Sequence, residues 1–331
     1  ARGLSAAIVA RHLARGGART AAADHYLEAA ATARSSYQTQ LAARYLRRAL
    51  RMLPADDPRR MEVHEALEGI ARVQGRWQER RRHLIALRRL ARKSNKPWWV
   101  ARALLRTARL EQDQGYLARG LASTQLAERA ARQAGSPEVE VQAQSLMSEL
   151  LRDLGDMQGA LAACDRALAA AARHEVPARL RADVLRSRGT LLRRVGRVHE
   201  AVDAHAEAIA VFKQVGARRS EASAKNALAL ALFVLGRFED AIALSLDAIR
   251  IDLAVGGRLQ IAKTLSTIGQ CYARLGDPRR GLAYLRRARE AHERYGDHDA
   301  RPDTLLATAE VLVELGDLAA ADSFVSDASG L

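Results

Sequence analysis

The chain has 331 residues and a formal net charge of +15 at pH 7, and it is 48% hydrophobic although only 4% aromatic. It holds no apolar run long enough for a membrane-spanning helix, which needs about 20 residues. The two cysteines, Cys164 and Cys271, lie far apart at apolar positions, so we expect buried free thiols in a reducing compartment. The composition excludes a disulfide-built secreted domain and predicts a cytoplasmic protein made of helices rich in Ala and Leu.

The basic excess is concentrated in the first third of the chain. Residues 1–100 hold 21 Lys and Arg against 8 Asp and Glu, whereas residues 101–331 hold 32 against 30. Such an asymmetry indicates a local basic surface. Arg greatly outnumbers Lys, so a GC-rich genome is an alternative source of part of this charge.

Three helices are expected in residues 1–58, near 8–14, 21–33 and 37–53. The pair Gly16 and Gly17 and the stretch 54–58, which begins and ends with proline, interrupt the helical spacing of apolar residues. These helices do not follow the spacing of the rest of the chain. We therefore predict an irregular leading segment at 1–58.

A period of 40 or 41 residues governs residues 59–331. It is marked by glycines between helical patterns, which we call the hinge glycines: Gly75, Gly115, Gly155, Gly196, Gly236, Gly276 and Gly316. A fixed period of this length predicts a repeat array rather than separate globular domains. We expect one continuous solenoid of seven helix pairs and no strands. The expected pairs are 59–74 with 78–93, 98–114 with 118–134, 138–154 with 158–174, 178–195 with 198–215, 218–235 with 239–255, 258–275 with 279–295, and 303–315 with 319–328.

A second glycine series, Gly135, Gly216, Gly256 and Gly296, follows the second helix of several pairs. The residue after the last turn of a helix often adopts a left-handed conformation, which glycine takes at little cost. We therefore expect helices to end at these glycines.

Small residues recur at fixed distances from the hinge glycines. Seven residues before the hinge stand Ala108, Ser148, Gly189, Ala229, Gly269 and Ala309. Five residues after it stand Gly120, Ala160, Ala201, Ala241, Gly281 and Ala321, and twelve after it Ala127, Ala167, Ala208, Ala248, Ala288 and Ala328. Small side chains at these positions let two packed helices approach closely. The pattern resembles the tetratricopeptide repeat from Gly115 onward and is weaker at Gly75, where Glu68 and Arg80 replace the small residues.

The resemblance implies an all-α fold, a right-handed superhelical solenoid of antiparallel helix pairs. Units of about 40 residues also resemble the tetratricopeptide regions of multidomain bacterial signalling ATPases and kinases. We therefore expect a non-catalytic scaffold for protein–protein interaction, the sensor or docking region of a larger signalling or regulatory protein. The sequence begins without Met and ends within an expected helix, so we expect a fragment. The alternative is the regulatory C-terminal part of a kinase or ATPase whose catalytic domain lies outside this sequence.

The resemblance further implies that the first helix of each pair lines a concave groove. The candidates are Arg106, Arg109, Arg152, Arg186, Arg193, Arg194, Asn226, Phe233 and Gln270. Arginine donates paired hydrogen bonds to carboxylates, so this groove predicts a peptide or protein partner with acidic groups. A solvated polar face is the alternative interpretation.

A basic patch is expected on the second helix of the first pair, made of Arg81, Arg82, Arg88, Arg89 and Arg92. On a second helix it should face outward, on the convex side. Such a patch could bind nucleic acid, an acidic partner or another part of the parent protein. No aromatic residues alternate with these arginines, which favours a solvated convex face over a nucleic-acid interface.

The sequence contains no recognisable catalytic or cofactor motif. Neither a phosphate-binding glycine-rich loop nor a nucleophile motif occurs, and no Cys and His residues have the spacing of a metal site. We therefore predict no cofactor and no metal. Trp77 stands two residues after a hinge glycine, so we expect it to pack in the core beneath the turn. The oligomeric state stays open.

Overall fold

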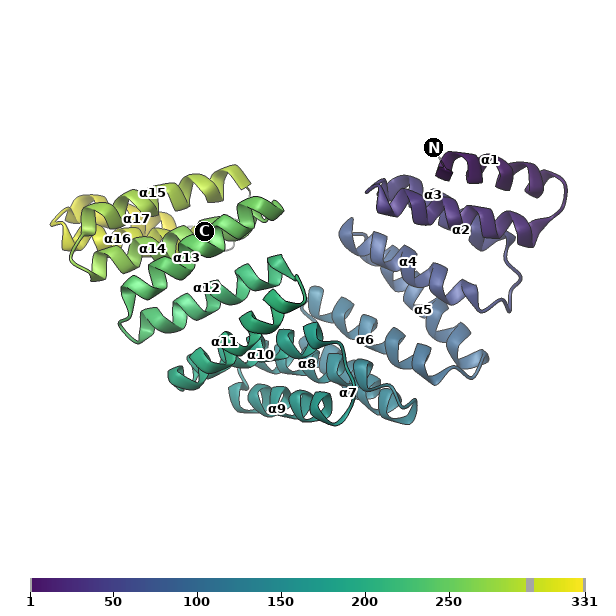
Figure 1. Ribbon diagram of the computed structural model, residues 1–331, viewed down its shortest axis with the longest axis horizontal. Coiled ribbons are helices and arrows are strands. Elements are labelled where there is room, and N and C mark those ends of the chain that lie inside the picture. The colour runs from purple at the N-terminus through teal and green to yellow at the C-terminus, as the bar shows by residue number, and fades with distance from the viewer. Residues whose placement is uncertain (1, 296–300, 330–331) are drawn as a thin grey trace. The chain divides into compact units, whose positions relative to one another are not determined.

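The computed structural model describes residues 2–295 and 301–329, and every regular element in these ranges is an α-helix (Figure 1). The helices are α1 (Arg2–Arg15), α2 (Arg19–Ser35), α3 (Thr39–Met52), α4 (Arg59–Val73), α5 (Trp77–Lys93), α6 (Pro97–Asp113), α7 (Leu117–Gln133), α8 (Pro137–Asp153), α9 (Met157–Arg173), α10 (Ala178–Arg194), α11 (Val198–Gln214), α12 (Arg218–Val234), α13 (Phe238–Val255), α14 (Arg258–Arg274), α15 (Pro278–Tyr295), α16 (Arg301–Glu314) and α17 (Leu318–Ser329). The predicted all-α chain is confirmed.

The chain divides into two compact units, Ala1–Asp156 and Met157–Leu331. In each unit, consecutive helices pack against each other, from α1 to α8 and from α9 to α17 (Figure 1). In the first unit α6 also touches α8, and in the second α10 touches α12, α12 touches α14 and α14 touches α16. The first helices of successive pairs therefore form a layer of their own, as a solenoid of helix pairs requires. The leading segment 1–58 and the continuity of residues 59–331 stay predictions.

The hinge glycines all turn the chain in the same way. At Gly236 the backbone has φ 75°, and the N–H of Arg237 donates to the carbonyl of Leu232 at 2.9 Å. This bond satisfies a carbonyl that the helix end would leave free, and glycine takes the left-handed conformation at little cost. Across the hinge glycines φ lies between 65° at Gly75 and 87° at Gly155. The period seen in the sequence is the period of this turn.

The far ends of the pairs use the same left-handed turn. The predicted glycines have φ of 59° at Gly135, 69° at Gly216 and 70° at Gly256, whereas Gly296 lies outside the described residues. Two further turns lack glycine, since Tyr37 has φ 57° after α2 and Asn95 has φ 49° after α5. Asparagine tolerates this conformation, but a bulky residue such as tyrosine is strained there by about 1 kcal/mol or more.

Paired helices approach each other through small residues. A Cβ on Gly281 of α15 would lie 2.7 Å from the carbonyl oxygen of Gly269 on α14, so the two backbones meet directly. A glycine on one helix also makes room for a larger residue on the other. Leu285 lies against Gly269, and the ring of His205 on α11 lies against Gly189 on α10. The sizes of the facing residues are therefore matched within each of these pairs.

The α4–α5 pair is built differently. Glu68 and Arg80, which replace the small residues, are each 1% exposed, and Arg80 Nε donates to Glu68 Oε1 at 2.9 Å. Arg80 Nη1 also donates to Asp113 of α6 at 2.7 Å. A buried ion pair thus occupies the space that is closed by small residues elsewhere.

Trp77 does not pack in the core. Its side chain is 41% exposed, and the Arg80 guanidinium lies over the indole ring, 5.5 Å from its centroid. The prediction that Trp77 is buried beneath the turn is wrong, because the buried Arg80 side chain occupies the space under the ring.

Candidate functional site

The predicted groove residue Arg106 lies on α6 and is held by two carboxylates of α4. Its Nε donates to Glu65 at 2.8 Å, and its Nη1 donates to the buried Glu68 at 2.6 Å. Both carboxylates belong to the preceding repeat. The positive charge of Arg106 is therefore compensated inside the first unit, which leaves it little attraction for an outside anion.

The other two predicted groove arginines of the first unit are also paired. Arg109 on α6 donates to Glu149 on α8 at 2.5 Å, and Arg152 donates to its neighbour Asp153 at 2.7 Å. Arg109 and Glu149 stand at the same distance from their hinge glycines, one repeat apart. The first-helix layer of this unit is thus a lattice of ion pairs rather than a bare basic surface.

In the second unit, all three predicted groove arginines lie on α10 and have no carboxylate partner among the described residues; we call Arg186, Arg193 and Arg194 the α10 arginines. Arg186 and Arg193 are half-buried and Arg194 is exposed. Burial lowers the pKa of Arg193, and the charge of Arg194 lowers it further. Three uncompensated cations on one helix make α10 the most suitable place in the predicted groove for an anion.

His205 of α11 lies against Gly189 of α10 and was not among the site residues predicted from the sequence. Its ring is fully buried, and neither ring nitrogen has a hydrogen-bond partner among the described residues. Burial lowers its pKa to about 4, helped by the charges of Arg186 and Arg193. The signal in the sequence was Gly189, whose missing side chain leaves room for the imidazole ring.

The predicted groove residues of α12, Asn226 and Phe233, both contact other side chains of the second unit. Asn226 on α12 donates to Thr264 on α14 at 2.5 Å, and its own carbonyl oxygen is buried without a partner. Phe233 stacks edge-to-face on Phe238, with 5.5 Å between the ring centroids. Gln270 is half-buried on α14. The layer of α10, α12 and α14 therefore passes from basic at α10 to uncharged polar and apolar at α12 and α14.

A tetratricopeptide-repeat family model matches residues 180–254, 220–280 and 260–329. Residues 180–329 are tetratricopeptide repeats. The helix pairs before residue 180 have the same hinge turn and similar bounds, so both units are built from tetratricopeptide-type helix pairs. Tetratricopeptide folds are in general non-catalytic. No curated protein matches the sequence.

Solved tetratricopeptide proteins share the fold. A signal transduction ATPase with numerous domains and a tetratricopeptide sensor, from Pyrococcus horikoshii, has TM-score 0.64 and 12% identity over 93% of this chain and 52% of that chain. Aspartyl phosphate phosphatase F from Bacillus subtilis has TM-score 0.62 and 14% identity, over 93% of this chain and 74% of that one. The Rap conjugation gene regulator of plasmid pLS20, solved with the Phr* peptide, has TM-score 0.52 and 17% identity, over 58% of this chain and 53% of that one. At these identities the likeness concerns the fold.

The predicted basic patch lies on α5, the second helix of the first regular tetratricopeptide pair. Arg81, Arg82, Arg89 and Arg92 are exposed and Arg88 is half-buried. Within residues 2–295 and 301–329, none of these five forms an ion pair, in contrast to Arg80 beside them. The patch therefore carries uncompensated charge, and its partner stays a prediction.

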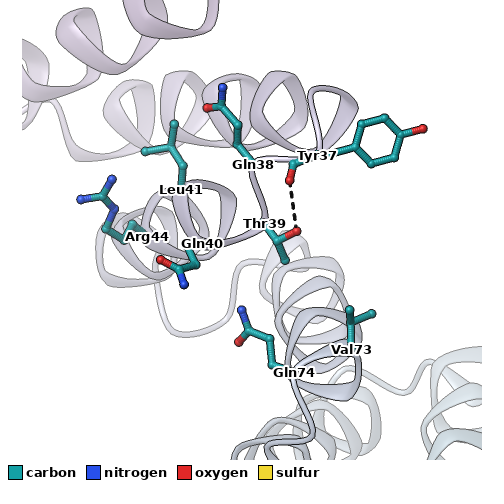
Figure 2. Close-up of a pocket in the computed structure, with 8 residues that line it drawn as sticks. All are labelled: Tyr37, Gln38, Thr39, Gln40, Leu41, Arg44, Val73 and Gln74. Carbon is teal, nitrogen blue, oxygen red and sulfur yellow. Dashed lines mark hydrogen bonds between the residues drawn. The ribbon is translucent and has the colours of Figure 1, made fainter. Parts of the chain in front are cut away.

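The turn between α2 and α3 contributes two hollows that the sequence did not indicate. One has a volume of about 620 Å³ and is lined by Tyr37, Gln38, Thr39, Gln40, Leu41, Arg44, Val73 and Gln74 (Figure 2). Figure 2 shows the Tyr37 ring pointing away from the other lining residues, and its carbonyl accepts a hydrogen bond from the Thr39 hydroxyl. The other hollow, of about 490 Å³, opens beside Gly69 and Arg106. Tyr37 is 93% exposed and Val73 76%, so both hollows have an apolar edge.

Cys164 and Cys271 are buried and form no disulfide, as predicted, and burial raises the pKa of Cys271 to about 12. No group of three or more His, Cys, Asp or Glu in the described residues could hold a metal ion. Across the same residues, no helix combines the length and apolar character that crossing a membrane demands.

Proposed function

We propose that the chain is a non-catalytic scaffold that binds an acidic peptide or protein segment along the layer formed by α10, α12 and α14. The observation that carries the proposal is the contrast between the two units. The groove arginines of the first unit are compensated by carboxylates, whereas the α10 arginines are not. An acidic segment would supply the missing carboxylates, and charge-assisted hydrogen bonds to arginine are among the stronger ones in proteins.

The remaining groove candidates are given supporting roles. Asn226 and Gln270 offer polar contacts to a peptide backbone, and Phe233 offers an apolar surface. Arg106, Arg109 and Arg152 could take part only by exchanging their present carboxylates for those of a partner, which yields little net energy. The pLS20 Rap regulator, which has the same fold and was solved with a peptide, supports a peptide as the kind of ligand.

Reversing the charge of Arg186 and Arg193 together is expected to weaken binding of a fluorescent Glu-rich peptide about tenfold or more, because each reversal turns an attraction into a repulsion. Fluorescence anisotropy at physiological salt measures this affinity. The matched control is Arg286→Glu with Arg287→Glu on α15, which changes the net charge equally at exposed positions of the same unit. Equal affinities of the α10 variant and the original chain, or equal losses in both variants, would contradict the proposal.

The place of the chain in a larger protein is part of the same proposal. The Pyrococcus horikoshii ATPase carries a tetratricopeptide sensor, and this chain spans about half of that protein. We place the chain as the sensor or docking region of a signalling or regulatory protein, with any kinase or ATPase domain elsewhere.

A second candidate function is binding of nucleic acid or another polyanion by α5. It is favoured by the unpaired arginines of the basic patch. The chain is expected to be retained on immobilised duplex DNA at low salt and released as salt rises, because phosphate binding displaces counterions. Changing Arg81, Arg88 and Arg92 to Glu is expected to abolish this retention. Retention that survives these changes would exclude α5 as the DNA-binding surface.

A further inference from the structure

The turn between α2 and α3 has the geometry of the hinge turns, but it holds a tyrosine where they hold a glycine. Tyr37 has φ 57°, and the N–H of Gln38 donates to the carbonyl of Ala33 at 2.8 Å, as in the turn at Gly236. Small buried residues also stand seven positions before, five after and twelve after this tyrosine: Ala30, Ala42 and Ala49. Tyr37 therefore occupies the position of a hinge glycine.

The strain at Tyr37 is not offset by packing within the described residues. A bulky residue in the left-handed conformation costs about 1 kcal/mol or more. The side chain is 93% exposed, and in the part of the chain that the structure describes its ring stacks on no other group and its hydroxyl makes no hydrogen bond. Tyrosine is enriched among the residues that contribute most to binding at protein interfaces. A strained and exposed tyrosine is therefore a candidate contact for a partner.

The surface beside Tyr37 offers the groups that an extended peptide needs. In the hollow of about 620 Å³, the exposed Val73 and the half-buried Leu41 supply an apolar wall. Gln40 of α3 and Gln74, which follows α4, line the same hollow (Figure 2), and neither side-chain amide makes a hydrogen bond among the described residues. An amide side chain both donates and accepts, so it matches the N–H and C=O groups of a peptide backbone.

The charge of this surface comes from Arg44. It is the one charged residue among the described ones that line the hollow, and it forms no ion pair with any of them. In the adjoining hollow, the two charged residues without an ion pair, Arg34 and Glu62, have opposite charges. The uncompensated charge is therefore that of Arg44, which favours a carboxylate in the partner.

We propose that this surface binds an extended segment of a partner protein in which a large apolar residue stands beside an acidic one. We call it the Tyr37 surface, and it consists of Tyr37, Gln40, Leu41, Arg44, Val73 and Gln74. The apolar side chain of the segment packs on Val73 and Leu41, and the neighbouring carboxylate accepts a hydrogen bond from Arg44. The Tyr37 ring, which points away from the hollow, contacts the segment beyond it. This site lies in the first unit and does not rest on the function proposed for the α10 arginines.

The experiment is an NMR titration of the full chain at pH 7, with isotope-labelled tyrosine and the hexapeptide acetyl-Gly-Ser-Phe-Glu-Ser-Gly-amide as the probe. The Tyr37 signal is assigned with Tyr37→Gly, which the fold should accept because the other hinge turns hold glycine. The peptide is expected to shift this signal in a saturable way. Replacing its Phe with Ser, or its Glu with Gln, should each weaken binding about tenfold, because the first removes an apolar contact and the second a charge-assisted hydrogen bond.

Variants of the surface are compared by fluorescence anisotropy of the same peptide labelled with fluorescein. Tyr37→Gly is expected to bind about tenfold more weakly. It should also raise the urea midpoint of the first unit, since it removes the strain. A tyrosine with a merely structural role would not give this combination. Arg44→Gln should weaken binding of the Glu peptide but leave that of the Gln peptide unchanged. The matched controls, Tyr116→Ser and Arg51→Gln, remove an exposed tyrosine and an exposed arginine of the same unit and should bind like the original chain.

Three results would overturn the Tyr37 surface as a binding site. These are a Tyr37 signal that ignores the peptide, an unchanged affinity in Tyr37→Gly, and a loss in Tyr116→Ser as large as that in Tyr37→Gly. Self-association of the original chain that Tyr37→Gly abolishes would also overturn it, because a second copy would then be the occupant. Analytical ultracentrifugation measures this.

The two binding sites can be told apart with the Arg186→Glu and Arg193→Glu double variant. Its Tyr37 signal should respond to the peptide as in the original chain. A signal that no longer responds would show that the peptide acts through α10, which would remove the Tyr37 surface and leave the proposed function standing. An unchanged response, together with no loss of Glu-rich peptide binding in the same variant, would leave the Tyr37 surface standing and contradict the proposed function.

Discussion

Replacing Arg80 with alanine is expected to lower the free energy of unfolding of the first unit by about 3 to 5 kcal/mol, because it leaves a buried carboxylate short of its partner. Glu68 and Arg80 are each 1% exposed. Without Arg80, the one remaining side-chain bond to Glu68 within the described residues is that from Arg106. Asp113, which is one-third exposed, also loses its arginine but can turn to water.

The double variant Glu68→Ala with Arg80→Ala is expected to lose less than the sum of the two single changes. It removes both charges together and places small residues where the other tetratricopeptide pairs have them. A coupling of at least about 2 kcal/mol is expected in this double-mutant cycle, since contacting charged partners are strongly non-additive. Urea unfolding followed by tryptophan fluorescence measures it for the first unit alone, because Trp77, Trp98 and Trp99 all lie there.

Arg76→Ala is the matched control for Arg80→Ala. Arg76 is an arginine near the start of the same helix, half-exposed and paired with Glu79 at 3.4 Å. Exposed ion pairs contribute about 0 to 1 kcal/mol, so this change should move the unfolding midpoint very little. Equal losses for Arg76→Ala and Arg80→Ala, or strict additivity in the cycle, would show that the buried ion pair does not hold α4 to α5.

The repeat was readable from sequence because its turn is a local requirement. Each hinge turn requires a left-handed backbone at one residue, and glycine adopts this conformation most easily. The left-handed turns at Tyr37 and Asn95 were not predicted, because neither residue is a glycine. The crossings were readable at Gly281 and Gly269 because close approach demands small residues there.

The ion pairs could not be predicted from the sequence, because pairing depends on which residues face each other across repeats. Arg109 was predicted to face the groove, and the structure joins it to Glu149, 40 positions further along the chain. Asn226 and Thr264 are joined in the same way, 38 positions apart. A comparison of residues one period apart would have indicated the first contact but not the second, which falls short of the period of 40 or 41 residues. That His205 has no hydrogen-bond partner among the described residues could not have been predicted in this way. It depends on which atoms surround the buried ring in the folded chain.

Acidification from about pH 7 to pH 5 is expected to destabilise the first unit by about 2 kcal/mol through His64. Burial, with the nearby charges of His83 and Arg60, lowers the pKa of His64 from 6.5 to about 4. The unfolded chain therefore binds a proton near pH 6.5 that the folded chain refuses until about pH 4. Stability from this group is complete above pH 6.5 and is lost progressively as the pH falls toward 4.

The partner of His64 acts in the same direction. This partner is His83. The Nδ1 atoms of His64 and His83 lie 3.0 Å apart, so one ring donates and the other accepts, and protonation of both would break this bond. Burial also lowers the pKa of His83.

In the second unit, Asp252 has the opposite effect on the pH dependence of stability. Burial raises its pKa to about 6, so its protonation favours the folded state as the pH falls. The loss of stability on acidification should therefore be larger in the first unit than in the second.

His64→Leu tests this assignment, because leucine stands at the corresponding position of α6 and α10, at Leu104 and Leu185. Urea unfolding at pH 7 and pH 5, followed by tryptophan fluorescence, should show that the variant loses most of the difference between the two conditions. The exposed His12 provides the control, and His12→Gln should keep the pH dependence of the original chain. An unchanged pH dependence in His64→Leu would mean that acid acts on the first unit through its carboxylate pairs, such as Glu79 with Arg47. The pKa of Glu79 is lowered, first of all by its hydrogen bond from Arg47, so that contribution would be lost only at lower pH.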